Sequence, residues 1–119
     1  MELAERFEAL APKLALMLTR ENGKTLAEAT GEVDVATTLR HCAAQSLTAV
    51  GTAAEVAPGQ YFSSPAEPVG VVAIIVPWNA PVALFIRSLG PALAAGNAVV
   101  AKLPAQTALT NALIADAIS

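Results

Sequence analysis

The chain has 119 residues, of which 55% are hydrophobic and 14% are charged, with a formal net charge of -3 at pH 7. This length fits one domain or part of a larger one, and the high apolar content excludes an intrinsically disordered protein. A net negative charge without a basic cluster excludes a surface that follows nucleic-acid phosphates. The single cysteine, Cys42, excludes an internal disulfide and a multi-cysteine zinc site, and it fits a reducing compartment.

The uncharged stretch from Val69 to Ile86 is as long as a membrane-spanning helix. Pro77 and Pro81 lie inside it, and in a bilayer they would leave backbone groups without hydrogen-bond partners. The N-terminus carries Glu2 and Glu5 where a secretory signal has basic residues. We therefore expect a soluble, cytoplasmic protein without membrane or nucleic-acid partners.

The first half of the chain has the residue pattern of helices. Apolar residues recur every three or four positions from Leu3 to Leu18, and we expect this helix to end at Asn22-Gly23, where glycine suits a left-handed cap. Thr25 and Glu28 have the spacing of a capping box that opens a second helix. We expect this second helix to continue through Ala44 or beyond, because Gly31 weakens it but need not stop it.

Three parts are expected along the chain. Residues 1–57 form a helical part, and residues 58–68, which are rich in Pro, Gly and Ser, form a loop or an irregular edge segment. Residues 69–119 change character and alternate between strand and helix. The predicted fold class is α/β, with N-terminal helices followed by a parallel βαβα unit.

The βαβα unit is predicted from two β-branched runs and two helical segments. Val71 to Val76 has no polar alternation, which is typical of a strand buried on both faces. A helix follows from Pro81 to Ala95, and Pro91 is expected to kink or restart it. Ala98 to Lys102 is a second buried strand, followed by a helix over about 107–118. This order implies two parallel strands joined by a crossover helix.

The residues just past the two strands are predicted to meet at one edge of the sheet. They are Pro77-Trp78-Asn79 and Lys102-Leu103-Pro104. Parallel strands present their carboxyl ends at the same edge, and ligands of open α/β sheets bind in the crevice there. From topology alone, Asn79 and Lys102 are either ordinary loop residues or members of a ligand site.

Several short motifs occur in a fixed order along nearly the whole chain. They are Glu21-Asn22-Gly23-Lys24, Gly31-Glu32-Val33, Glu67-Pro68-Val69-Gly70, Pro77-Trp78-Asn79-Ala80-Pro81, Pro91-Ala92-Leu93-Ala94-Ala95-Gly96-Asn97 and Val99-Val100-Ala101-Lys102. Each motif is weak alone, but the ordered set resembles the aldehyde dehydrogenase superfamily. The resemblance implies oxidation of an aldehyde to a carboxylic acid with NAD or NADP. It also implies that residues 1–119 are a partial, Rossmann-like cofactor-binding domain.

The resemblance assigns roles to residues at the predicted sheet edge. Asn79 matches the asparagine whose side-chain amide helps to form the oxyanion hole. A neutral donor there stabilises the negative charge that develops when a thiolate attacks an aldehyde. Pro77 and Trp78 match positions that line the channel of the nicotinamide cofactor, and Lys102 matches the lysine that hydrogen-bonds the adenosine ribose.

Pro104 and Ala105 lie in the same cofactor-contacting turn by resemblance. Ala105 stands where the family often has a glutamate that also holds the ribose, so the choice between NAD and NADP stays open. Family members carry a nucleophilic cysteine and a general-base glutamate downstream of the lysine motif, beyond the position of Ser119. We therefore expect the 119-residue chain to be inactive by itself.

Other reactive side chains are expected to be structural. Cys42 and His41 are adjacent on a predicted helix, where neighbours point about 100° apart and do not form a dyad, and one histidine cannot form a metal site alone. Glu32 and Asp34 are expected on a solvated helix face. The alternative function is a non-catalytic remnant or interaction module that associates with homologous subunits through an exposed apolar surface.

Overall fold

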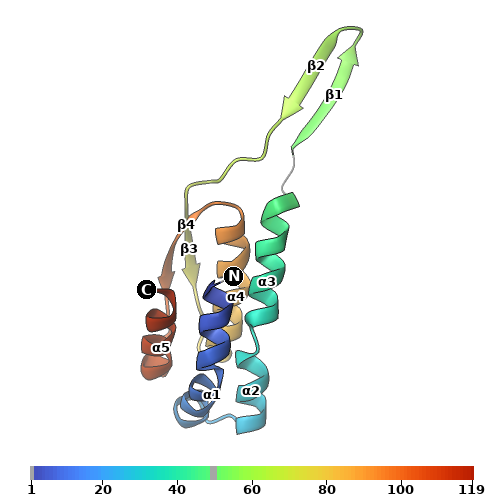
Figure 1. Cartoon of the computed structure of the whole chain (residues 1–119). Coiled ribbons are helices and arrows are strands. Elements are labelled where there is room, and N and C mark those ends of the chain that lie inside the picture. The colour runs from blue at the N-terminus through green and yellow to red at the C-terminus, as the bar shows by residue number, and fades with distance from the viewer. Residues whose placement is uncertain (1, 49–50) are drawn as a thin grey trace.

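The computed structural model describes residues 2–48 and 51–119. In order along the chain (Figure 1), the elements are α1 (Glu2–Asn22), α2 (Leu26–Val33), α3 (Ala36–Gln45), β1 (Thr52–Ala57), β2 (Gln60–Ser64), β3 (Val71–Ile75), α4 (Pro81–Ala94), β4 (Ala98–Lys102) and α5 (Ala108–Ile118). Short 3-10 turns follow α3 at Ser46–Thr48 and precede α5 at Ala105–Thr107. None of the helices in the described ranges has the length and apolar character needed to span a membrane.

A sharp corner joins α1 to α2, as the sequence predicts. Gly23 has a φ of 79° and its N–H donates to the carbonyl oxygen of Thr19 at 3.2 Å, which ends α1 in a left-handed cap. The capping box is also confirmed. Thr25 Oγ1 accepts from the Glu28 N–H at 3.2 Å, and the Glu28 carboxylate accepts from the Thr25 N–H at 2.9 Å.

The long second helix predicted through Ala44 is wrong, because α2 and α3 are separate helices. The break falls at Asp34, whose φ of -76° and ψ of 67° place it in an inverse γ-turn closed by the Val35 N–H on the Val33 carbonyl at 2.9 Å. This turn lets both Val33 and Val35, together with Ala36, enter the core. Burial of these apolar side chains favours the break over a continuous helix.

Residues 52–64 form an antiparallel β-hairpin, so the predicted helical part does not extend to residue 57 and the predicted loop over 58–68 begins inside the hairpin. Thr52 pairs with Ser64, and Gly59 takes a φ of 76° in the turn between β1 and β2. Figure 1 shows the hairpin projecting away from the helices. Its side chains are exposed on both faces apart from the half-buried Ala57, so the sequence carries no burial alternation that predicts a strand.

The predicted parallel βαβ unit is confirmed. β3 and β4 pair in parallel from Val71 with Ala98 to Ile75 with Lys102, and α4 runs as one helix through Pro91 between them. The expectation that these strands are buried on both faces is wrong for this chain. Ile74 lies in the core, whereas Val71 and Ile75 are 68% and 77% exposed, because the described helices cover one face of the sheet only.

The core lies between that covered face and the five helices. Its largest fully buried side chains come from α1, α4 and α5: Phe7, Leu14 and Leu18 from α1, Val82, Phe85 and Ile86 from α4, and Ile114 from α5. Burying each such side chain contributes about 1.5–3 kcal/mol. The core therefore fixes α1 beside the sheet, which brings the corner after α1 to the carboxyl edge of β3 and β4.

Candidate active site at the strand ends

The two strand-end segments lie side by side, as predicted. The Val76 N–H donates to the carbonyl oxygen of Lys102 at 3.0 Å, which continues the β3–β4 ladder by one residue. Pro77, Trp78 and Asn79 therefore leave the sheet beside the last residue of β4. This edge is where a βαβ unit binds ligands.

Most of the candidate residues present their side chains to solvent at this edge. Pro77, Trp78, Asn79, Lys102 and Ala105 are exposed. Together they offer an indole ring, a side-chain amide with donor and acceptor, and an ammonium with three donors.

Pro104 differs from the other candidates because it is buried. Its carbonyl oxygen accepts a hydrogen bond from Asn111 Nδ2 at 2.7 Å. In this structure, Pro104 therefore holds the turn between β4 and α5, and Ala105 is exposed in that turn.

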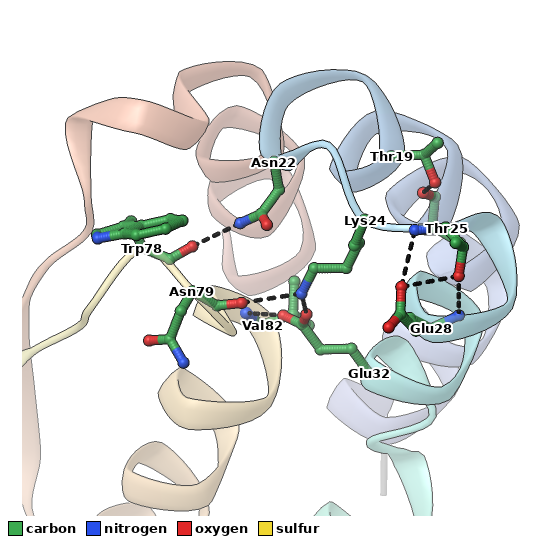
Figure 2. A network of polar contacts seen from close by, with 10 residues as sticks. Thr19, Asn22, Lys24, Thr25, Glu28, Glu32, Trp78, Asn79 and Val82 are labelled. Atoms are coloured by element: carbon green, nitrogen blue, oxygen red, sulfur yellow. Dashed lines mark hydrogen bonds and ion pairs between the residues drawn. The ribbon is translucent and has the colours of Figure 1, made fainter.

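The loop that carries Asn79 is held through its backbone by the α1–α2 corner (Figure 2). Asn22 Nδ2 donates to the carbonyl oxygen of Trp78 at 2.6 Å, and Lys24 Nζ donates to the carbonyl oxygen of Asn79 at 2.9 Å. Figure 2 shows the Asn79 side chain pointing away from Lys24. Within the described residues, its amide has no hydrogen-bond partner, so it is available to a ligand.

The prediction that Glu32 lies on a solvated helix face is wrong. Its side chain is only 6% exposed, it forms an ion pair with Lys24, and its Oε1 accepts from the Val82 N–H at 3.0 Å. Asp34, by contrast, is exposed as expected. Glu32 thus caps the N-terminus of α4 from another helix, where a negative charge is also favoured by the helix dipole.

Glu21 plays the equivalent part for α5. Its carboxylate accepts from the N–H groups of Leu109 and Thr110, both at 2.8 Å, and from Thr110 Oγ1 at 2.7 Å. Partial desolvation raises the pKa of Glu21, but these hydrogen bonds together outweigh it and hold the pKa below its usual value. The carboxylate is therefore ionised near neutral pH and fixes the start of α5 beside the candidate site.

Four side chains that hold the edge together were not predicted from the sequence: Glu21, Asn22, Lys24 and Glu32. One signal for Glu32 was present, because it lies three residues after the small, buried Ala29 and therefore on the same face of α2. A second signal was Ala80, which precedes Pro81 and has no side chain able to cap α4.

Cys42 and His41 lie on α3 and are not part of the strand-end segments. Cys42 is 5% exposed and packs between α3 and α4, where a Cβ added at Gly90 would lie 2.9 Å from its Sγ. His41 is exposed on α3. Over residues 2–48 and 51–119, no group of three or more His, Cys, Asp or Glu side chains is arranged to hold a metal ion.

Comparison with known proteins gives one consistent family. The model of the aldehyde dehydrogenase family matches residues 1–119. The chain is 43% identical over 106 residues to the 3,6-anhydro-alpha-L-galactose dehydrogenase of Streptomyces coelicolor, a match that covers 88% of this chain and 22% of that protein. It is 36% identical over 121 residues to the 2,5-dioxopentanoate dehydrogenase of Saccharolobus solfataricus, and this match covers 100% of this chain and 25% of that protein.

Solved structures agree with this result. A crystal structure of an aldehyde dehydrogenase from Brucella melitensis biovar abortus matches with a TM-score of 0.88 and 35% identity, over 98% of this chain and 24% of that one. A 3,6-anhydro-L-galactose dehydrogenase in complex with NAP matches with a TM-score of 0.87 and 31% identity, over 98% of this chain and 26% of that one. The chain spans about a quarter of the length of these relatives.

The hydrogen bonds of Glu21 predict how acid affects this chain. Since the folded-state pKa lies below the usual 4.5, the stabilisation is complete above that value and is lost as the pH falls through the lower, folded-state value. Glu21→Gln should lower the free energy of unfolding by about 1 kcal/mol at neutral pH. Urea unfolding from about pH 7 to about pH 3 should show a steeper acid loss in the native chain than in this variant.

The matched control for this comparison is Glu67→Gln, because Glu67 is an exposed carboxylate in the segment before β3. This control should retain the acid loss of the native chain. Equal acid slopes for the native chain and Glu21→Gln would show that the contacts of Glu21 with α5 contribute nothing to stability.

Proposed function

Because the chain belongs to the aldehyde dehydrogenase family, we propose that it forms part of the catalytic and cofactor-binding edge of an enzyme that oxidises an aldehyde to a carboxylic acid with NAD or NADP. Residues 1–119 would be a partial cofactor-binding domain of that enzyme, working in the cytoplasm, where a lone buried thiol such as Cys42 stays reduced. The observation that carries the proposal is an exposed Asn79 amide on a loop whose backbone is fixed from outside.

Asn79 is proposed to stabilise an oxyanion. Attack of a cysteine thiolate on an aldehyde forms a carbon–sulfur bond and places the carbonyl electron pair on oxygen. A side-chain N–H that is already in position lowers the energy of this charge as it develops, without the reorganisation that water requires. The side-chain amide of Asn79 has this chemistry. The backbone carbonyl of the same residue already accepts a hydrogen bond from Lys24.

Lys102, Trp78 and Pro77 are proposed to hold the nicotinamide cofactor, which accepts a hydride in this reaction. The donor set fits such a group in part, because the exposed Lys102 ammonium can donate to ribose hydroxyls while Trp78 and Pro77 offer apolar surface. Ala105 is exposed in the neighbouring turn and offers no side-chain acceptor to the ribose. We assign Pro104 to the shape of that turn, since its ring is buried.

The alternative is an interaction module that associates with homologous subunits. It is favoured by the apolar side chains of the β1–β2 hairpin, where Tyr61 and Phe62 are 79% and 55% exposed. Activity separates the two proposals. A catalytic segment must support turnover when it is placed in a complete enzyme, whereas a remnant has no reason to retain a working site.

A complete enzyme for these tests is obtained from the Streptomyces coelicolor relative by replacing the segment that the chain matches with the chain itself. We call this chimera the carrier enzyme, and the unmodified relative is its reference. The relative's name supplies the assay aldehyde, 3,6-anhydro-alpha-L-galactose. Turnover by the carrier supports the catalytic proposal, and a folded but inactive carrier favours the interaction module.

The proposed role of Asn79 predicts a loss in the chemical step. Asn79→Ala in the carrier should lower kcat by about 10²–10³-fold, with a much smaller effect on cofactor affinity. Asn79→Asp should be at least as impaired, because a carboxylate repels the charge that the amide is meant to stabilise. Single-turnover acylation and the melting temperature should be measured together. Normal acylation by a folded Asn79→Ala carrier would contradict the oxyanion role.

The proposed role of Lys102 predicts a loss in binding. Lys102→Ala in the carrier should weaken cofactor binding by about 1.5–3 kcal/mol, the value of a hydrogen bond from a charged group, and leave the KM for the aldehyde nearly unchanged. Fluorescence titration with NAD and with NADP measures both affinities. Lys13→Ala, on the exposed surface of α1, is the matched control. Cofactor affinity that is equal in the Lys102 and control variants would assign Lys102 no role in binding.

A further inference from the structure

The loop between β3 and α4 and the first turn of α4 are fixed by contacts from α1, α2 and the corner between them. The contacts hold two carbonyl oxygens of the loop, those of Trp78 and Asn79, and the N–H of Val82 in the first turn of α4 (Figure 2). The partners are Asn22, Lys24 and Glu32. None of these contacts uses the side chain of Asn79, so they fix the backbone from which the amide projects and leave the amide free.

The start of α4 cannot provide these contacts itself. Ala80 occupies the N-cap position with no side-chain hydrogen bond, and Pro81 has no N–H. Val82 is therefore the first residue of α4 with an N–H that needs an acceptor, and Glu32 supplies it at 3.0 Å. The same carboxylate pairs with the Lys24 ammonium, which in turn binds the Asn79 carbonyl.

The Lys24–Glu32 pair, which joins the corner to α2, is better shielded from solvent than the ion pair that links α3 to α1. The side chains of Lys24 and Glu32 are 15% and 6% exposed, whereas those of Arg40 and Glu8, which link α3 to α1, are 37% and 59% exposed. A shielded pair is weakly screened by salt and water, and removal of one partner leaves a buried charge without compensation. The pair thus holds one arrangement of the loop strongly.

We propose that Lys24 and Glu32 are positioning residues for the oxyanion donor Asn79. Lys24 fixes the carbonyl oxygen of Asn79, Glu32 fixes the first turn of α4, and the ion pair couples the two contacts. The direction of the Asn79 amide then depends on a pair of charges on α2 and the corner before it. This inference rests on the proposed oxyanion role of Asn79, and its test is designed to fail separately from that role.

The test compares Lys24→Met with Arg40→Met in the carrier enzyme. Displacing a catalytic group by about 1 Å can cost on the order of 100-fold in rate, so Lys24→Met should lower kcat by about 10–100-fold. The KM for the aldehyde and the affinity for the cofactor should change less than about twofold, because the ground-state contacts remain. Arg40→Met breaks the exposed ion pair and should leave both parameters near those of the carrier.

A double-mutant cycle that combines Lys24→Met with Asn79→Ala shows how Lys24 acts. If Lys24 works through the Asn79 amide, Lys24→Met should have almost no further effect on kcat in the Asn79→Ala background. An equal loss in both backgrounds, or an unchanged kcat in Lys24→Met while Asn79→Ala is impaired, would overturn the positioning role and leave the oxyanion role standing. An unimpaired Asn79→Ala would instead remove the oxyanion role itself.

If the Lys24→Met carrier does not fold, Glu32→Gln replaces it in the same double-mutant cycle. The glutamine keeps the side-chain shape and an oxygen for the Val82 N–H, but it loses the charge that orients Lys24. We expect a loss of about 3–10-fold in kcat, with KM unchanged, and again no further loss in the Asn79→Ala background. A kcat equal to that of the carrier would overturn the proposal.

Discussion

The corner between α1 and α2 is the constraint on which the candidate site depends. Within four consecutive residues, Glu21 binds the first turn of α5, Asn22 binds the carbonyl oxygen of Trp78 and Lys24 binds that of Asn79. A sheet of two strands has little means of its own to fix the loops that leave it. The left-handed cap at Gly23 and the capping box at Thr25 make the corner rigid enough to do this from outside.

This constraint explains why the side chains that bind the loop backbone at the sheet edge differ from those available to a ligand. Charged and amide side chains of the corner bind backbone groups of the loop, so the loop side chains stay available to a ligand. The crossover helix α4 and the final helix α5 both begin with backbone N–H groups that donate to a carboxylate from another helix. This carboxylate is Glu32 for α4 and Glu21 for α5. These carboxylates satisfy orphan donors and add a favourable interaction with the helix dipole, so they set where each helix starts.

Much of the fold was predictable from the sequence because its signals are local. Gly23, Thr25 and Glu28 encode the corner by themselves, and the β-branched runs before Pro77 and Lys102 encode the parallel strands and hence the site edge. The hairpin was not predictable, because exposure of nearly all of its side chains removes the alternation that reveals a strand. The role of Glu32 was also missed, since its contact with the Val82 N–H depends on tertiary packing that places α2 beside α4.

The most direct test of the central claim is a crystal structure of the carrier enzyme with bound cofactor and an unreactive analogue of the aldehyde. We predict that Lys24 Nζ remains on the Asn79 carbonyl and Glu32 on the Val82 N–H. We also predict that Asn79 Nδ2 lies within hydrogen-bond distance, about 2.7–3.2 Å, of the analogue's oxygen. An Asn79 amide turned away from that oxygen, or a loop released from Lys24 and Glu32 when the ligands bind, would contradict the account.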